Sequence, residues 1–296
     1  MIKNMDRGIL FMLLSALISA LNGAVAKILS QEFSALEIVF YRNLLGVLII
    51  LYTLKHTSTT LKGGKFHLLF LRGVFGASAM VLFFYTITVI PLGEAITLNK
   101  TSPFFVSILA FYLMNEHLSK RAMLALVIGF IGIVLITKSW GLSISYAHFL
   151  GIMGGFFAAA AYATIKKIKD IYDTRIIMLS FMGVGTLFPF ILFILSIWVK
   201  QPPTYLEFLF TGISWHKEPY MWLLIGFMAL ISTVSQWLLT KAYSFSKASI
   251  IGVISYTNIP FAIGFGWMLG DAFPDFWTFT GIGLIVLGGV LVGKAK

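Results

Sequence analysis

Five basic residues lie inside long apolar runs of the sequence. They are Lys27, Arg42, Arg72, Lys100 and Lys241. A cation near the middle of a bilayer costs about 3 kcal/mol on insertion scales, so each one needs a partner, a wet cavity or a route by which its stem reaches the interface. No matching set of acidic residues lies at the same depth. A space that these cations share should therefore carry a positive potential and favour an anionic or zwitterionic ligand.

Lys100 is the strongest candidate for contact with such a ligand. It is the deepest of the five and follows Asn99 directly. Pro103 comes shortly after it and frees a backbone carbonyl in the preceding turn, because proline has no N–H. We expect Lys100, together with an arginine, to take a carboxylate or phosphate group.

The other four cations are open to more than one interpretation. Arg42 and Arg72 lie about 8 to 9 Å below opposite surfaces at 1.5 Å per residue. Each either stabilises the structure, by reaching the interface or helix-end carbonyls, or contacts the substrate through its planar fork. Lys241 lies near the inner end of its run, so contact with the substrate and extension of its stem to the interface are equal alternatives. Lys27 is assigned no role.

Further polar residues and aromatic residues also recur on the apolar runs. Stripes at helical spacing consist of Ser15, Ser19 and Asn22; of Glu94, Thr97 and Thr101; and of Ser232, Gln236, Thr240 and Tyr243. In lipid such stripes either join helices by hydrogen bonds or line a cavity. The residues predicted to point at something polar are Asn22, Asn99, Gln236 and Asn258, and those predicted to stack on a substrate ring are Tyr85 and Tyr256.

Apolar helices are the elements that must position these side chains. Hydrophobic residues make up 59% of the 296 residues and charged residues only 11%, which leaves too few polar side chains to cover a water-soluble protein. Stretches long enough to cross about 30 Å of hydrocarbon run from roughly 8 to 29, 36 to 54, 67 to 90, 94 to 114, 121 to 137, 148 to 165, 176 to 199, 220 to 243, 248 to 270 and 276 to 293. The sequence therefore predicts an all-α polytopic membrane protein with ten transmembrane helices, and not a β-barrel, which would alternate with period two.

The remaining basic residues support an even number of crossings. With the N-terminus inside, fourteen fall in inner segments and three in outer connections, as the positive-inside rule requires. Both termini should therefore face the cytoplasm, with the protein in the cell membrane. The net charge of +11 is accounted for by this distribution, and no basic stripe on a soluble element indicates nucleic acid.

The two halves of the sequence repeat one pattern. Residues 20 to 23 align with residues 160 to 163 at an offset of 140, and Glu116 aligns with Asp271 at an offset of 155. Both acidic residues end a helix just before the next begins, where a carboxylate can cap free amides. We expect two five-helix repeats, 1–140 and 141–296, and an odd number of crossings makes the second repeat inverted, an architecture common in transporters.

Further features concern helix packing. Gly151 and Gly155, like Gly289 and Gly293, have the spacing that permits close contact between helices, which indicates packing and not dimerisation. Three proline residues are expected to kink helices, with Pro103 and Pro260 acting either as pivots during conformational change or as static bends. These residues are Pro103, Pro189 and Pro260.

Several short motifs carry a resemblance to a known family. They are Tyr41-Arg42-Asn43, Leu71-Arg72-Gly73, Ser102-Pro103-Phe104, the run from Asn115 to Ser119, Ile259-Pro260-Phe261 and Leu269-Gly270-Asp271. With these motifs the sequence resembles, over nearly its whole length, the ten-span EamA-type permeases of the drug/metabolite transporter superfamily. The resemblance implies inverted five-helix repeats, a central cavity and the movement of small organic solutes.

We therefore expect a secondary transporter that moves a small anionic or zwitterionic metabolite by alternating access, as a monomer or weak dimer, without cofactor or metal. An uptake permease for a charged cofactor such as S-adenosylmethionine and an amino-acid or drug exporter are the alternatives. An enzyme would need a nucleophile–base pair, a metal cluster or paired carboxylates at membrane depth, and a channel would need rings of charge. The sequence indicates neither.

Overall fold

The computed structural model describes residues 2–57, 63–90, 92–114, 119–137, 146–199, 201–213, 218–270 and 275–293. Within these ranges the chain is helical and contains no β-strand. The caps predicted at Glu116 and Asp271 lie outside the described residues.

The helices follow the predicted apolar runs closely. Their bounds are α1 Ile2–Leu29, α2 Ala35–His56, α3 Phe66–Val89, α4 Leu92–Asn99, α5 Ser102–Met114, α6 Lys120–Thr137, α7 Tyr146–Ile168, α8 Thr174–Trp198, η2 Thr204–Leu209, α9 Pro219–Phe245, α10 Ala248–Ile254, η3 Ser255–Thr257, α11 Asn258–Met268 and α12 Phe276–Gly293. In the part of the chain that the structure describes, seven helical stretches are long and apolar enough to cross a membrane. Three shorter apolar helices lie at Ser102–Tyr112, Met123–Leu135 and Phe279–Gly288.

Two of the predicted spans are interrupted, which corrects the expectation of continuous kinked helices. The fourth breaks at Lys100 and Thr101, between α4 and α5. The ninth tightens into the 3-10 turn η3 between α10 and α11. Pro103 and Pro260 both lie in the first turn of the helix after the interruption. Proline is tolerated there because the first N–H groups of a helix have no partner within it, whereas farther inside it removes a hydrogen bond.

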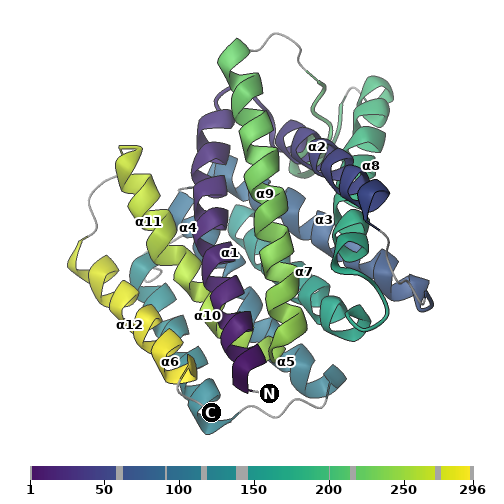
Figure 1. The fold of residues 1–296 in the computed structure, drawn as a ribbon. Helices are drawn as coiled ribbons and strands as arrows, with labels where there is room; N and C mark the ends of the chain where they lie inside the picture. Colours follow the sequence, from purple (N-terminus) through teal and green to yellow (C-terminus); the bar gives the residue numbers. More distant parts are fainter. Residues whose placement is uncertain are drawn as a thin grey trace.

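Helices of the first half of the chain pack on helices of the second half. α1 packs along α9, α2 on α8, α3 on α7, and α6 on α12. Figure 1 shows α1 and α9 side by side through the middle of the bundle, with the start of α1 and the end of α12 at the same end. That placement fits an even number of crossings.

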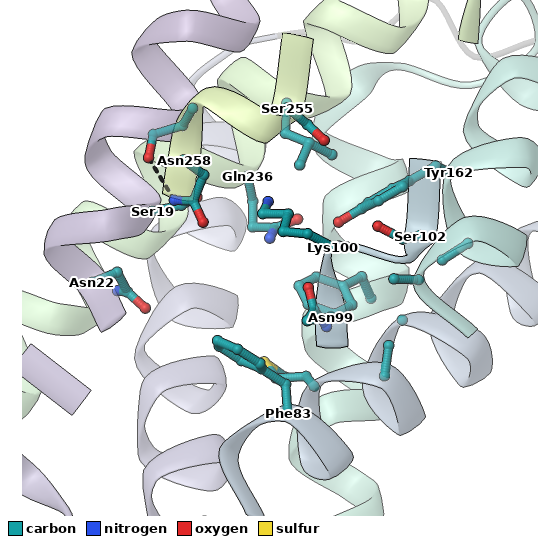
Figure 2. A pocket seen from close by; sticks show the side chains of 18 of the residues that line it. Ser19, Asn22, Phe83, Asn99, Lys100, Ser102, Tyr162, Gln236, Ser255 and Asn258 are labelled. Atoms are coloured by element: carbon teal, nitrogen blue, oxygen red, sulfur yellow. Dashed lines mark hydrogen bonds between the residues drawn. The ribbon is translucent and has the colours of Figure 1, made fainter. Parts of the chain in front are cut away.

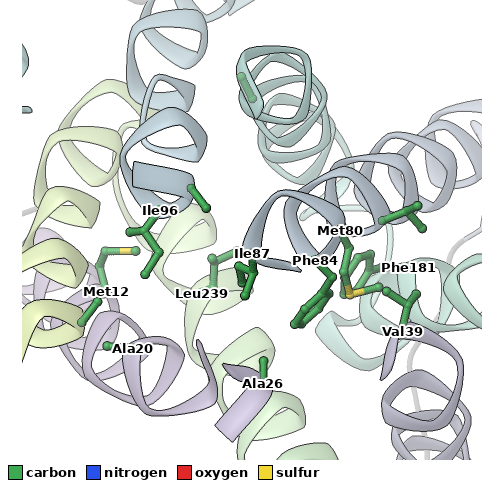
Figure 3. Close-up of a cluster of buried hydrophobic side chains, with 14 of the residues drawn as sticks. Met12, Ala20, Ala26, Val39, Met80, Phe84, Ile87, Ile96, Phe181 and Leu239 are labelled. Atoms are coloured by element: carbon green, nitrogen blue, oxygen red, sulfur yellow. The ribbon is translucent and has the colours of Figure 1, made fainter. Parts of the chain in front are cut away.

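The interior of the bundle is tightly packed, and its surface is apolar. Met80 and Phe84 of α3 lie beside Phe181 of α8 in the buried cluster of Figure 3. Large apolar side chains such as Trp198 and Leu223 are exposed on the outside, as expected of a surface that faces lipid. Because lipid is as apolar as these side chains, packing and hydrogen bonds between helices must hold the bundle together.

Such hydrogen bonds join α1 to α9. Ser15 Oγ donates to the main-chain oxygen of Ser235 at 2.9 Å, and Ser19 Oγ lies 2.6 Å from Ser235 Oγ. Asn22 Nδ2 donates to the main-chain oxygen of Met228 at 3.2 Å. The polar stripe predicted on the first span therefore joins two helices.

Candidate functional site

A cavity of about 140 Å³ lies among the helices, and both interruptions reach it. Asn99, Lys100 and Ser102 line it from the first interruption. Ser255 and Asn258 line it from the second. The remaining lining comes from α1, α2, α3, α7, α8 and α9, so both halves of the chain contribute to one site.

Lys100 occupies the middle of this cavity. Its side chain extends from the α4–α5 interruption toward Gln236 of α9, and the Tyr162 hydroxyl points to the same space (Figure 2). Within the described residues, Gln236 Oε1 is buried and has no hydrogen-bond partner. An ammonium group and an amide thus face one another across the cavity.

Glycines of α7 allow the interruption to come this close. A Cβ atom built on Gly155 would clash with Thr101 Oγ1 and would lie 3.2 Å from the main-chain oxygen of Leu98. One built on Gly151 would lie 2.9 Å from Leu98 Cβ. The Gly151 and Gly155 pair therefore serves packing within the chain, and it positions the segment that carries Lys100.

Arg42 and Arg72 also line the cavity, and both are buried inside the bundle. Arg42 is 6% exposed and Arg72 is 1% exposed. Arg42 Nη1 contacts Met80 Sδ, and its guanidinium lies 5.8 Å over the Phe84 ring. The Arg72 guanidinium lies 4.6 Å over the Phe181 ring. In the part of the chain that is described, the Nε atoms of both arginines are buried and make no hydrogen bond.

These aromatic and thioether contacts do not neutralise the two arginines. A cation–π contact contributes about 0.5 to 2 kcal/mol, whereas removing an ion from water costs several kcal/mol even in real proteins. No aspartate or glutamate is among the described residues that line the cavity. With Lys100, the lining carries three cations and a strongly positive potential.

The predicted amide residues lie in the lining. Asn22, Asn99 and Gln236 all contribute to it, and so does Asn258. Asn258 Nδ2 also donates to the main-chain oxygen of Ala16 at 2.8 Å (Figure 2). Side-chain amides offer both donors and acceptors, so these four amides can orient a polar ligand.

Three residues predicted to contact the substrate lie outside the lining. Tyr85 stacks on Phe208 of η2, with ring centroids 4.0 Å apart. Tyr256 is fully buried against α6, where a Cβ on Gly129 would come within 2.6 Å of its Cε2. The Lys241 ammonium lies 5.8 Å over the Trp237 ring. Helical phase and neighbouring helices direct these three side chains elsewhere.

Two tyrosines in the lining were not predicted as site residues. Tyr162 and Tyr243 stack at 4.8 Å with an interplanar angle of 18°. Tyr243 belongs to the polar stripe predicted on α9, and Tyr162 is the counterpart of Asn22 in the repeat alignment. Tyr162 could therefore have been predicted by including, for each predicted site residue, the residue that aligns with it in the other half of the sequence.

Comparison with known proteins decides the family. A family model described as the EamA-like transporter family matches residues 6–138 and again residues 145–294. The chain belongs to the EamA-like transporter family. It is similar to an uncharacterized transporter of Helicobacter pylori, with 32% identity over 96% of this chain and 94% of the relative.

Other EamA-like relatives and a solved structure agree. The pseudopaline exporter CntI of Pseudomonas aeruginosa is 30% identical over 98% of this chain and 96% of its own. A solved crystal structure shares the fold, with a TM-score of 0.73, 14% identity and coverage of 99% of both chains. The family and the transporter relatives identify this membrane protein as a small-molecule transporter and point away from an enzyme.

Proposed function

We propose that this EamA-like protein is a secondary transporter that moves a small anionic or zwitterionic metabolite across the cell membrane by alternating access. The observation that carries the proposal is that Lys100, Arg42 and Arg72 all line one cavity whose described lining holds no carboxylate. A buried cation without an anionic partner is costly, and a bound anion removes that cost. S-adenosylmethionine, with its additional positive charge, fits this lining poorly.

Lys100 is the residue that we assign to the acidic group of the substrate. An ammonium group donates up to three hydrogen bonds and attracts a carboxylate as a point charge. Ser102, which begins α5, lies in the same lining, so the positive end of that helix adds to the attraction. Interrupted helices that aim an N-terminus at an anionic group are a recurring device of secondary transporters.

The size of the cavity limits the substrate. A cavity of 140 Å³ is close to the roughly 150 Å³ that holds benzene in an engineered protein core. A metabolite of about ten or fewer non-hydrogen atoms fits such a space. A larger solute would enter only after the helices separate, which alternating access provides.

The proposed topology has ten spans in two inverted repeats, residues 1–140 and 141–296. The seven long stretches and the three shorter apolar helices together support ten crossings. A helix interruption followed by a proline occurs once in each half, at Pro103 and at Pro260, which supports the repeat. The distribution of Lys and Arg places both termini in the cytoplasm.

Flux in proteoliposomes tests the function. Purified protein should show saturable flux with counterflow for at least one small acidic or zwitterionic metabolite, and the Lys100→Met variant should lose at least about tenfold in flux. Lys241→Met is the matched control, because Lys241 lies in the membrane but outside the cavity lining, and it should stay within about twofold. Non-saturating flux would indicate a pore, and normal flux in Lys100→Met would refute the assignment.

The direction of transport follows from the same vesicles. Because the Pseudomonas relative is named an exporter, we propose export as the first direction to test. Vesicles loaded with the metabolite should release it through the protein molecules whose cytoplasmic face points into the vesicle. Labelling of the termini distinguishes these molecules from those in the opposite orientation.

A further inference from the structure

We propose that Arg42 and Arg72 form a second anion-binding subsite beside Lys100, and that the transported metabolite therefore carries two acidic groups. The inference rests on the proposed transport function and narrows its substrate class to small diacids. Two observations support it: the positions of the two guanidinium groups and the side chains that surround them.

The two arginines start on different helices and meet on one stretch of α3. Arg72 belongs to α3 and extends along it, so that its Nη1 lies against Gly76, where a Cβ would clash with it. Arg42 belongs to α2, and its Nη1 contacts Met80 Sδ. Gly76 and Met80 are one helical turn apart, or about 6 Å along the axis. Two guanidinium groups therefore lie at adjacent turns of one helix.

The surroundings of this pair do not compensate its charge. The Met80, Phe84 and Phe181 side chains that the guanidinium groups contact supply no anion. Tyr162 is the titratable side chain that interacts electrostatically with Arg72. Both guanidinium groups are buried in the cavity lining without a described anionic partner, so an anion bound between the two neighbouring turns of α3 gains from both. The planar fork of arginine suits the oxygen pair of a carboxylate or phosphate.

Lys100 enters the cavity from the α4–α5 interruption, whereas the two guanidinium groups lie along α3. Its main-chain N–H bonds to the oxygen of Ile96 at 2.9 Å, so Ile96 marks the turn that leads to it. Figure 3 shows Ile96 apart from the group formed by Met80, Phe84 and Phe181. Tyr162 lines the same cavity as Arg72, and its hydroxyl points to the space around Lys100 (Figure 2). One acidic group at Lys100 leaves the arginine pair available for another.

The cavity volume restricts the separation of the two acidic groups. At 140 Å³ it accommodates a diacid with a short carbon chain, such as succinate, or an amino diacid such as glutamate. The amides of Asn22 and Gln236 lie in the same lining and can bond to the middle of such a molecule.

Binding of matched acids to the detergent-purified full chain tests the second subsite. The probes are succinate against succinamate and glutamate against glutamine, pairs of nearly equal size that differ by one acidic group. We expect each diacid to bind at least about tenfold more tightly than its amide partner. Arg42→Gln and Arg72→Gln should each reduce that preference to below about threefold.

Three further variants keep the result interpretable. Arg7→Gln, at an exposed arginine outside the lining, should leave the preference unchanged. Arg42→Lys and Arg72→Lys keep the charge and the fold but lose the fork, so they should retain a reduced preference. Lys100→Met should weaken both members of each pair, which reports on the proposed substrate site separately.

The proposal is overturned if diacids and their amide partners bind alike, or if Arg42→Gln and Arg72→Gln keep the full preference. In either case a loss of affinity in Lys100→Met would still support the proposed function. Absence of any thermal stabilisation by all four acids at about 10 mM also overturns the diacid subsite. If counterflow of another metabolite is then observed, the protein is still a transporter, and only the diacid subsite is wrong.

Discussion

Asn258 of α11 donates a hydrogen bond from Nδ2 to the main-chain oxygen of Ala16 on α1, at 2.8 Å. Both residues line the cavity, and the bond ties the second helix interruption to the first helix of the chain. Because α1 is itself hydrogen-bonded to α9, a movement of α11 must break this bond or carry α1 and α9 with it.

Removing this tie should loosen the packing of α11. Asn258→Ala should destabilise the protein by about 1 kcal/mol, the range found for hydrogen bonds between membrane helices. Thr257→Ala is the control, because Thr257 Oγ1 bonds to Ile254 within its own helical turn. Thermal unfolding of the purified variants measures the difference. Equal melting temperatures for the two variants would mean that the tie contributes nothing.

Gly155 should tolerate no side chain. An alanine there would clash with Thr101 Oγ1 and press on the carbonyls of Leu98 and Asn99, so the segment that holds Lys100 must move. Overpacking of this kind costs about 1 to 3 kcal/mol, and we expect Gly155→Ala to lower both stability and transport.

Gly183 provides the matched control on α8, since nothing lies within 4 Å of a Cβ built there. Gly183→Ala should be neutral or stabilising by up to about 1 kcal/mol, because alanine favours a helix more than glycine does. Transport and melting temperature are measured for both variants. If they behave alike, close packing at Gly155 does not position the interruption.

Tyr85 should matter for stability and not for substrate affinity. Its ring stacks on Phe208 at 4.0 Å with an interplanar angle of 30°, and it does not line the cavity. Tyr85→Ala and Phe208→Ala should show a coupling energy of about 0.5 to 1.5 kcal/mol in a double-mutant cycle. The KM for transport should change by less than about twofold in Tyr85→Ala. A larger rise in KM, with stability unchanged, would instead indicate that Tyr85 contacts the substrate.

Asp173 should give the start of α8 a pH-dependent contribution to stability. Its partial burial alone would raise the pKa of the carboxyl group, but hydrogen bonds from the Arg175 side chain and main chain, and the charges of Arg175 and Lys241, bring that pKa below its ordinary value. A folded-state pKa that is lowered contributes stability at neutral pH, and the contribution is lost as pH falls through the folded-state value. Because the pair is partly exposed, we expect only a few tenths of a kcal/mol.

Asp173→Asn isolates this charge, because asparagine can still cap the helix. The variant should melt slightly below the parent protein at pH 7, and the two melting temperatures should converge only as pH falls below the ordinary value of 3.8 and through the lower folded-state pKa. Arg175 also donates from Nη1 to the main-chain oxygen of Thr53 on α2 at 3.1 Å, so Arg175→Gln should cost more than Asp173→Asn. A difference between Asp173→Asn and parent that persists at low pH would assign the effect to packing.

The sequence by itself determined the helices, because hydropathy and segment length are local properties that the bilayer constrains directly. It also identified which cations belong to the apolar runs. The interruption at Lys100 was not predicted, although Pro103 was recognised. A proline either kinks a helix or begins a new one, and packing against Gly155 rather than local propensity decides between them here.

Only the tertiary structure decided which of these residues share one space. Lys100 and Lys241 are both lysines within predicted apolar runs, yet one occupies the cavity and the other lies over Trp237. Arg42 and Arg72, predicted near opposite surfaces, turn toward the same stretch of α3. The direction of a side chain depends on the phase of its helix and on the neighbours from the other half of the chain, and neither is encoded in a segment read alone.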